Sequence, residues 1–209
     1  MTNTFLHVGC GNMTKEYTTP AFNTNEWKEV RADIDEAVKP DIITSMTDMS
    51  IIKDKSYDAI YSSHNIEHLY AHEVPSAVRE FSRVLKEDGF LIITCPDLKS
   101  VCHQVSNGNL TGVLYESTAG PICAIDILYG LRPAMAIGNL YMAHKVGFTA
   151  DVLKDTLTQF GFQHAIVAAV PSRYVLWGIA TKKEKVDSVE LFEILKTHTD
   201  LLKETKVSN

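Results

Sequence analysis

A short apolar run that ends in two closely spaced glycines, FLHVGCGN, occupies residues 5–12 of the chain. About twenty residues further on, at the spacing that nucleotide-binding α/β units use, a second predicted strand ends at Asp33 and Asp35. Glycine lets a backbone pass close to a ligand because it has no Cβ, and a carboxylate at the tip of the neighbouring strand can accept both hydroxyl hydrogens of a ribose. The layout therefore predicts a nucleoside site at the edge of an α/β sheet.

The rest of the hydrophobic pattern extends this sheet. Strands are predicted at residues 4–9, 29–34, 41–44, 57–62, 90–94, 163–170 and 173–181. Apolar residues recur at helical spacing from Val74 to Leu85, with Pro75 in the first turn and Gly89 as the stop. Strands that alternate with helices through the first hundred residues predict a doubly wound, mostly parallel, seven-stranded sheet, and the last two strands predict an antiparallel C-terminal hairpin.

Residues 97–147 break this rhythm with many glycines and prolines. We expect a long irregular insertion there, because long connections often serve as lids or binding loops. A helix over 149–160 resumes the pattern, so one domain is predicted for residues 1–182. The tail over 183–209 is expected to form an amphipathic helix that packs on this domain or on a second subunit, which leaves a homodimer open.

Composition excludes several classes of partner. The chain has 209 residues, of which 45% are apolar, and this suits one domain with a full core. A net charge of −6 argues against a nucleic-acid partner. We expect no signal peptide and no membrane span, because the apolar stretches are too short. Four cysteines, without metal-site or disulfide spacing, predict a reduced cytoplasmic protein: Cys10, Cys95, Cys102 and Cys123.

Motifs over most of residues 4–97 resemble the class I S-adenosylmethionine-dependent methyltransferases. The matching segments, in the family's order, are LHVGCG at 6–11, ADID at 32–35, TDM at 47–49, YDAIYSSHNIEHL at 57–69 and REFSRVLKEDGFLII at 79–93. The resemblance implies S-adenosylmethionine as cofactor and ten cofactor-binding residues: His7, Gly9, Cys10, Gly11, Asp33, Ile34, Asp48, Met49, Ser63 and His64. His7 departs from the family pattern, which usually has an acidic residue there.

The resemblance also implies particular roles. Asp33 would hold the ribose hydroxyls, with Asp35 as the alternative, while Gly9 and Gly11 would lie against the ribose and the methionine end. Asp48 would face the adenine amino group and Met49 would pack on the ring. Ser63 and His64 would border the methionine moiety.

Methyl transfer from a sulfonium requires mainly that a nucleophile is aligned and water excluded. A general base is needed only where the nucleophile carries a proton, and four residues are candidates for a catalytic role: His64, Glu67, His68 and His144. The methyl acceptor is expected to be a small molecule with an O, N or C nucleophile. Residues in the insertion are expected to line its pocket, or else to form a small satellite core: Tyr115, Tyr129, Arg132, Tyr141 and His144.

Three other interpretations compete with this one. The glycine segment has Thr14 where the dinucleotide fingerprint has its third glycine, which weakens an NAD-dependent oxidoreductase. Residues 64–68, HNIEH, also fit the H-x-x-E-H pattern of zinc proteases, although that pattern needs both histidines on one helical face. A divalent metal at Glu67 and His68 stays open, but no resident metal is expected. The same fold could also bind the cofactor without turnover, as a regulatory or interaction protein.

Overall fold

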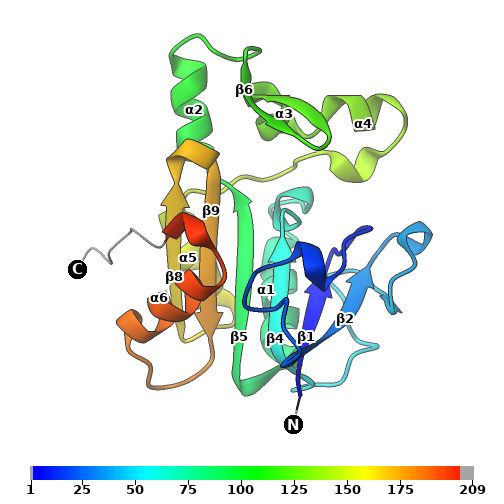
Figure 1. The fold of residues 1–209 in the computed structure, drawn as a ribbon, viewed down its shortest axis with the longest axis vertical. Coiled ribbons are helices and arrows are strands. Elements are labelled where there is room, and N and C mark those ends of the chain that lie inside the picture. The colour runs from blue at the N-terminus through cyan, green and yellow to red at the C-terminus, as the bar shows by residue number, and fades with distance from the viewer. Residues whose placement is uncertain (1, 203–209) are drawn as a thin grey trace.

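A computed structural model describes residues 2–202 as a seven-stranded sheet with a smaller unit above one edge (Figure 1). The strand order is β3-β2-β1-β4-β5-β9-β8. Five strands run parallel: β1 (Asn3–Val8), β2 (Trp27–Asp33), β3 (Ile42–Ile43), β4 (Tyr57–Ser63) and β5 (Leu85–Pro96). The last two, β8 (His164–Val170) and β9 (Val175–Thr181), form an antiparallel hairpin, and β9 is antiparallel to β5. The predicted sheet and hairpin are confirmed.

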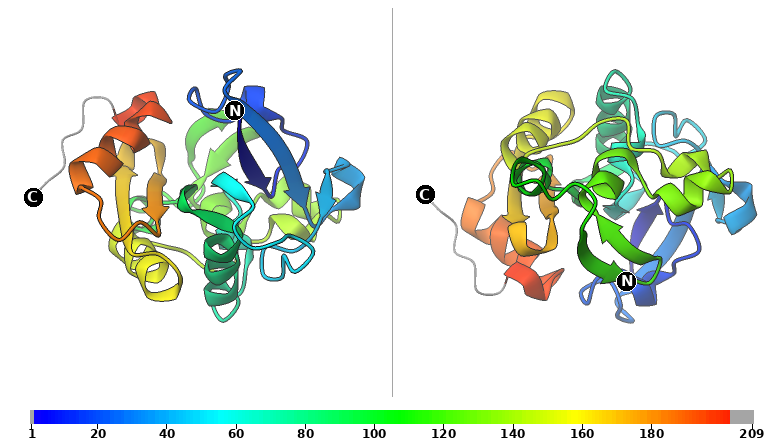
Figure 2. Two further views of the ribbon diagram at one scale, coloured as in Figure 1. Left: turned by 90° about the horizontal axis from the view of Figure 1, so that it is seen from below. Right: turned by 90° about the horizontal axis from the view of Figure 1, so that it is seen from above.

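Helices cover both faces of the sheet (Figure 2). On one face, α1 (Val74–Val84) and α5 (Ala150–Phe160) pack over a core that includes Leu6, Ile60 and Leu91. The other face is covered by α6 (Ser188–Thr197) and by the segment around Phe22, over a second cluster that includes Phe5, Tyr61 and Ile92. The predicted tail helix is thus α6, which packs on its own sheet, while residues 203–209 of the predicted tail lie outside the described chain. No helix within residues 2–202 combines the length and apolar character needed to cross a membrane.

Two local predictions are wrong. Helix α1 ends at Val84 and runs directly into β5, so Gly89 lies inside a strand instead of stopping a helix. The sequence does not indicate that β5 begins at Leu85, because the polar residues 86–88 form an irregularity in the pairing between β4 and β5. The first two strands are also followed by 3-10 turns, η1 (Lys15–Tyr17) and η2 (Glu36–Val38), in place of α-helices.

The segment over 97–147 is far more regular than predicted. It contains α2 (Leu98–Ser106), a hairpin of β6 (Val113–Ser117) and β7 (Gly120–Cys123), α3 (Ala124–Tyr129), α4 (Arg132–Ala136) and the 3-10 turn η4 (Leu140–Met142). Its own small core is formed by Val101, Ile122, Ala124 and Ile127. Several glycines that suggested irregular chain occupy positive-φ turns between these short elements. This insertion lies over the carboxyl edge of the parallel strands (Figures 1 and 2).

Candidate active site

The loop after β1 has a conformation that requires its glycines. Gly9 has φ of +63°, and a Cβ there would stand 2.3 Å from the Asn65 side-chain oxygen. Asn65 is held in place because its Nδ2 donates to the Val8 carbonyl at 2.8 Å. Gly11 has φ of +51°, and a Cβ there would meet no atom of the described chain within 4 Å. Gly9 therefore serves the packing of the loop, whereas Gly11 borders open space at the sheet edge.

Asp33 at the end of β2 faces this loop. Its Oδ2 accepts the Gly11 N–H at 2.8 Å and its Oδ1 accepts the Asp35 N–H at 2.9 Å. A carboxylate has about four lone-pair sites, so each oxygen can still accept a hydroxyl. The Asp35 carboxylate instead caps η2 by accepting the Ala37 N–H. Ile34 between them is 54% exposed, an apolar side chain at the edge where an adenosine would lie.

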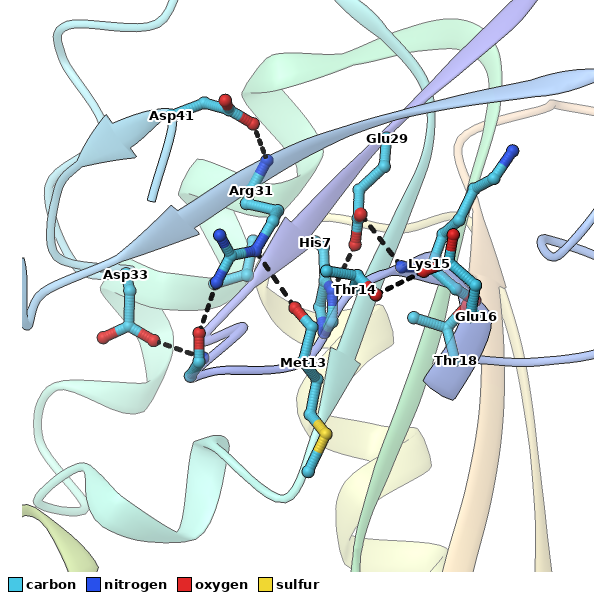
Figure 3. Close-up of polar contacts among 12 residues, drawn as sticks. His7, Met13, Thr14, Lys15, Glu16, Thr18, Glu29, Arg31, Asp33 and Asp41 are labelled. Atoms are coloured by element: carbon cyan, nitrogen blue, oxygen red, sulfur yellow. Dashed lines mark hydrogen bonds and ion pairs between the residues drawn. The ribbon is translucent and has the colours of Figure 1, made fainter. Parts of the chain in front are cut away.

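Two charged residues of β2 that sequence reasoning missed fix the loop in position (Figure 3). The Arg31 guanidinium donates to the carbonyls of Gly11, at 2.6 Å, and Met13, at 3.0 Å. Glu29 lies 2.7 Å from the His7 Nδ1 and accepts the Lys15 N–H at 2.9 Å. A signal for them was present, because residues 29, 31 and 33 alternate along one strand and so share a face.

His7 is buried in this network. Its ring lies 5.2 Å from the Tyr61 ring and only 4% of the residue is exposed. Cys10, in the glycine loop, is buried too, and burial raises the pKa of its thiol to about 11. The thiol is therefore protonated and unreactive at neutral pH.

The segment after β3 places its two predicted residues differently. Asp48 is exposed, and hydrogen bonds from Ser50 lower the pKa of its carboxyl. Met49 is fully buried in the main core, and its N–H donates to Glu80 at 2.6 Å. The predicted contact of Met49 with an adenine ring would require the side chain to leave that core position.

The end of β4 has an uncommon backbone conformation. Ser63 Oγ lies 2.7 Å from Thr94 Oγ1 on β5. His64 follows with φ of +54°, a left-handed conformation that is uncommon for a residue with a side chain. Its N–H donates to the Thr94 carbonyl, and its half-exposed ring places Nδ1 3.2 Å from Glu67 Oε1. Such strain is concentrated at functional sites.

A cavity of about 550 Å³ lies between these strand ends and the insertion. Its walls bring together all four predicted catalytic residues, His64, Glu67, His68 and His144. Of the residues predicted for an acceptor pocket, Tyr115 also lines it, and Tyr129 lines a smaller adjoining cavity of about 230 Å³.

The remaining predicted pocket residues are placed outside these walls. Arg132 pairs with the Asp126 carboxylate at 2.6 Å, and Tyr141 is exposed at the surface. The buried residues of the insertion's small core are aliphatic, with Tyr174 packed against them and the Tyr115 ring stacked on Tyr174, so of the predicted aromatic residues only Tyr115 lies beside this core within the described chain. Sequence reasoning missed Tyr174 and Trp177, which line the cavity because the antiparallel β9 begins at the same edge where the parallel strands end.

Glu67 is the buried carboxylate beside the histidines of the cavity wall. Burial raises the pKa of Glu67, but the hydrogen bond and charge of His64 and the charge of His68 outweigh it, so the net pKa is lowered. Burial lowers the pKa of His144. At neutral pH the cavity therefore contains a carboxylate beside a neutral imidazole at His144.

The alternatives drawn from motifs do not fit this geometry. The zinc-protease pattern needs one helix that carries both histidines, whereas His64 follows the end of β4 and His68 lies in the short 3-10 turn η3 (Ile66–His68). The NAD interpretation needs a helix that begins at the glycine loop and points its N-terminus at a pyrophosphate. The described chain has the three-residue turn η1 there.

Comparisons with known proteins concern the fold and the domain family. The model of the methyltransferase domain family matches residues 6–93. No curated protein matches the sequence.

Solved structures share the fold over most of the chain. A protein from Pyrococcus horikoshii OT3 is 14% identical, with a TM-score of 0.56, over 88% of this chain and 83% of that one. A SAM dependent methyltransferase from Archaeoglobus fulgidus is 15% identical, with a TM-score of 0.54, over 86% of each chain. The 1,6-didemethyltoxoflavin-N1-methyltransferase from Burkholderia thailandensis, with bound 1,6-didemethyltoxoflavin and S-adenosylhomocysteine, is 10% identical, with a TM-score of 0.52, over 87% of this chain and 72% of that one.

The sheet order and the solved structures give the chain the fold of these methyltransferases, and the methyltransferase-domain match covers residues 6–93 of it.

Proposed function

We propose that the protein methylates a small molecule, bound in the 550 Å³ cavity, at an oxygen, nitrogen or carbon nucleophile. The observation that carries this proposal is the cavity itself, which adjoins His64 at the cofactor edge and is covered by the insertion. Its volume falls within the range of small-molecule sites, about 300–1,000 Å³. S-adenosylmethionine supplies an activated methyl group when bound, so the protein's task is to bind, orient and exclude water.

The residues of the sheet edge fit the cofactor. Asp33 keeps free lone pairs for ribose hydroxyls, the open space at Gly11 admits the nucleoside, and the exposed Ile34 offers an apolar surface to the base. Asp33 accepts the N–H of Gly11 and so lies beside this open space, whereas the Asp35 carboxylate faces η2, which favours Asp33 as the ribose ligand. Ser63 and His64 stand where β4 ends, between this edge and the cavity.

His64 is the group best placed to accept a proton from an oxygen or nitrogen nucleophile. Its Nδ1 faces the Glu67 carboxylate, which would orient the ring and stabilise its charged form. The ring is half exposed and lines the cavity, so Nε2 is the nitrogen available to an acceptor. A carbon nucleophile that is already activated would not require this step.

Methyl transfer can be tested directly. Purified protein is incubated with S-adenosylmethionine labelled in the methyl group and with a panel of phenols, carboxylic acids, amines and activated-methylene compounds. Labelled product that depends on an acceptor supports the proposal. Calorimetric titration with S-adenosylhomocysteine runs beside it, because tight binding of this product without transfer to any acceptor would instead indicate a regulatory or interaction protein.

A further inference from the structure

Three side chains with metal-binding chemistry meet at the wall of the cavity. One potential ligand atom each from Glu67, His68 and His144 lies within 4.8 Å of the other two. Two imidazoles and one carboxylate are the ligand set of many catalytic zinc sites and suit other first-row divalent ions. Glu67 and His68 come from the turn η3 after β4, and His144 comes from the insertion.

Both imidazoles are already oriented as metal ligands usually are. The Nδ1 of His68 lies 3.1 Å from the Ala143 carbonyl, and the Nδ1 of His144 lies 2.7 Å from the Ile127 carbonyl. A carbonyl oxygen can only accept, so each Nδ1 carries a hydrogen, and in the neutral ring each Nε2 then has the lone pair that a metal ion needs. Histidines that bind metals commonly donate their other ring N–H to a backbone carbonyl in this way.

Glu67 supplies a negative charge that the protein leaves partly unsatisfied. The side chain is 1% exposed, and while Oε1 faces His64, the buried Oε2 has no hydrogen-bond partner among residues 2–202. A buried carboxylate oxygen without a partner is costly. A cation held between Glu67 and the two imidazoles would satisfy it.

Backbone hydrogen bonds hold the two segments together independently of these side chains. The Glu67 carbonyl accepts the N–H groups of Lys145, at 2.8 Å, and Val146, at 3.3 Å. The His144 N–H donates to the Tyr129 carbonyl at 3.2 Å. Ligand atoms about 2.1 Å from one ion in a tetrahedron stand about 3.4 Å apart. The three atoms lie within 4.8 Å of one another, so binding would draw them together by at most about 1.4 Å.

We propose that Glu67, His68 and His144 bind one divalent first-row metal ion, of the class of Zn²⁺ and Co²⁺, with its open coordination positions facing the 550 Å³ cavity. The site is distinct from the His64 ring, which keeps its contact with the other oxygen of Glu67. A second part rests on the proposed function: an acceptor in the cavity would reach the ion through an oxygen or nitrogen atom, which makes O- or N-methylation the reaction.

The test uses Co²⁺ alone, without cofactor or acceptor. Untagged, chelator-treated protein is titrated with Co²⁺ and followed by visible absorption and by calorimetry, beside the variants Glu67→Gln and His144→Gln. The exposed His103 on α2 provides a matched control, His103→Gln. Absence of a thiolate charge-transfer band excludes binding at the exposed Cys102. Thermal melting checks that each variant is folded.

The expected result is one Co²⁺ per chain, displaced by Zn²⁺, with affinity reduced at least about tenfold in Glu67→Gln and His144→Gln and unchanged in His103→Gln. Wild-type protein that binds no Co²⁺ at millimolar concentration would overturn the proposal. The proposal would also be overturned if Glu67→Gln and His144→Gln are folded and bind Co²⁺ as tightly as the wild type, because the ion would then lie elsewhere. These outcomes are independent of methyl transfer, and a carbon-methylated product would refute the second part only.

Discussion

The buried His198 makes the stability of the fold depend on pH. It follows α6, is 3% exposed, and places Nδ1 2.8 Å from Thr19 Oγ1 while its ring contacts Phe22. Burial lowers the pKa of His198 from 6.5 to about 4. The unfolded chain therefore binds a proton between these two values that the folded chain does not, and stability must fall as pH falls through this window.

The magnitude follows from the two pKa values. Their difference of about 2.5, at about 1.36 kcal/mol per pH unit, corresponds to a loss of about 3 kcal/mol below pH 4. About 2 kcal/mol of it is already lost at about pH 5, whereas almost none is lost above about pH 7.5.

Urea unfolding at about pH 7.5 and about pH 5 measures this effect against His198→Asn. Asparagine can keep the hydrogen bond to Thr19 but does not titrate. The wild type should lose about 2 kcal/mol more between the two pH values than the variant loses, because all other titrating groups cancel in the difference. Parallel pH dependence of the two proteins would refute the reasoning.

Three further predictions concern the site. Gly9→Ala should destabilise the fold by about 2–4 kcal/mol in urea unfolding, since it combines strain at positive φ with a clash against Asn65; a change below about 0.5 kcal/mol would contradict the loop geometry. Asp33→Ala should weaken S-adenosylhomocysteine binding by about 1.5–3 kcal/mol in calorimetry, with Asp35→Ala as the matched control; the reverse order would move the ribose ligand to Asp35. His64→Asn, which tolerates the left-handed backbone, should lower transfer to an O or N acceptor at saturating cofactor about 100-fold or more, and an unchanged rate would remove His64 as proton acceptor.

The strands could be predicted where their apolar runs are continuous. β1 and β4 lie within a residue of their predicted bounds, because both faces of these central strands are buried and their sequences show it. The start of β5 could not be predicted, since Lys86, Glu87 and Asp88 look like a loop and enter the strand only through an irregular pairing with β4. The insertion was predicted, but its hairpin and α4 were not, because these elements are too short for periodicity to show.

The residues of the candidate site also fall into those that the sequence could predict and those that it could not. Gly9, Gly11 and Asp33 could be selected because the ends of adjacent parallel strands must meet at one edge. The approach of His144 to Glu67 and His68 could not be derived, since it depends on how the insertion folds back over that edge. The antiparallel direction of β9 likewise decides that Trp177 reaches the cavity, and that direction is a property of the sheet as a whole.

The backbone at the carboxyl edge of the sheet indicates that His64 serves function at the expense of stability. Gly9 and His64 follow adjacent strands, both at positive φ, and the Asn65 side chain fills the space beside the Gly9 Cα. A histidine in this conformation costs about 1 kcal/mol or more relative to glycine, although glycine at position 64 would relieve the strain. Stability alone would therefore favour glycine there. In return for this strain, the chain has an imidazole that lines the cavity next to the buried Glu67 carboxylate, and glycine could not supply it.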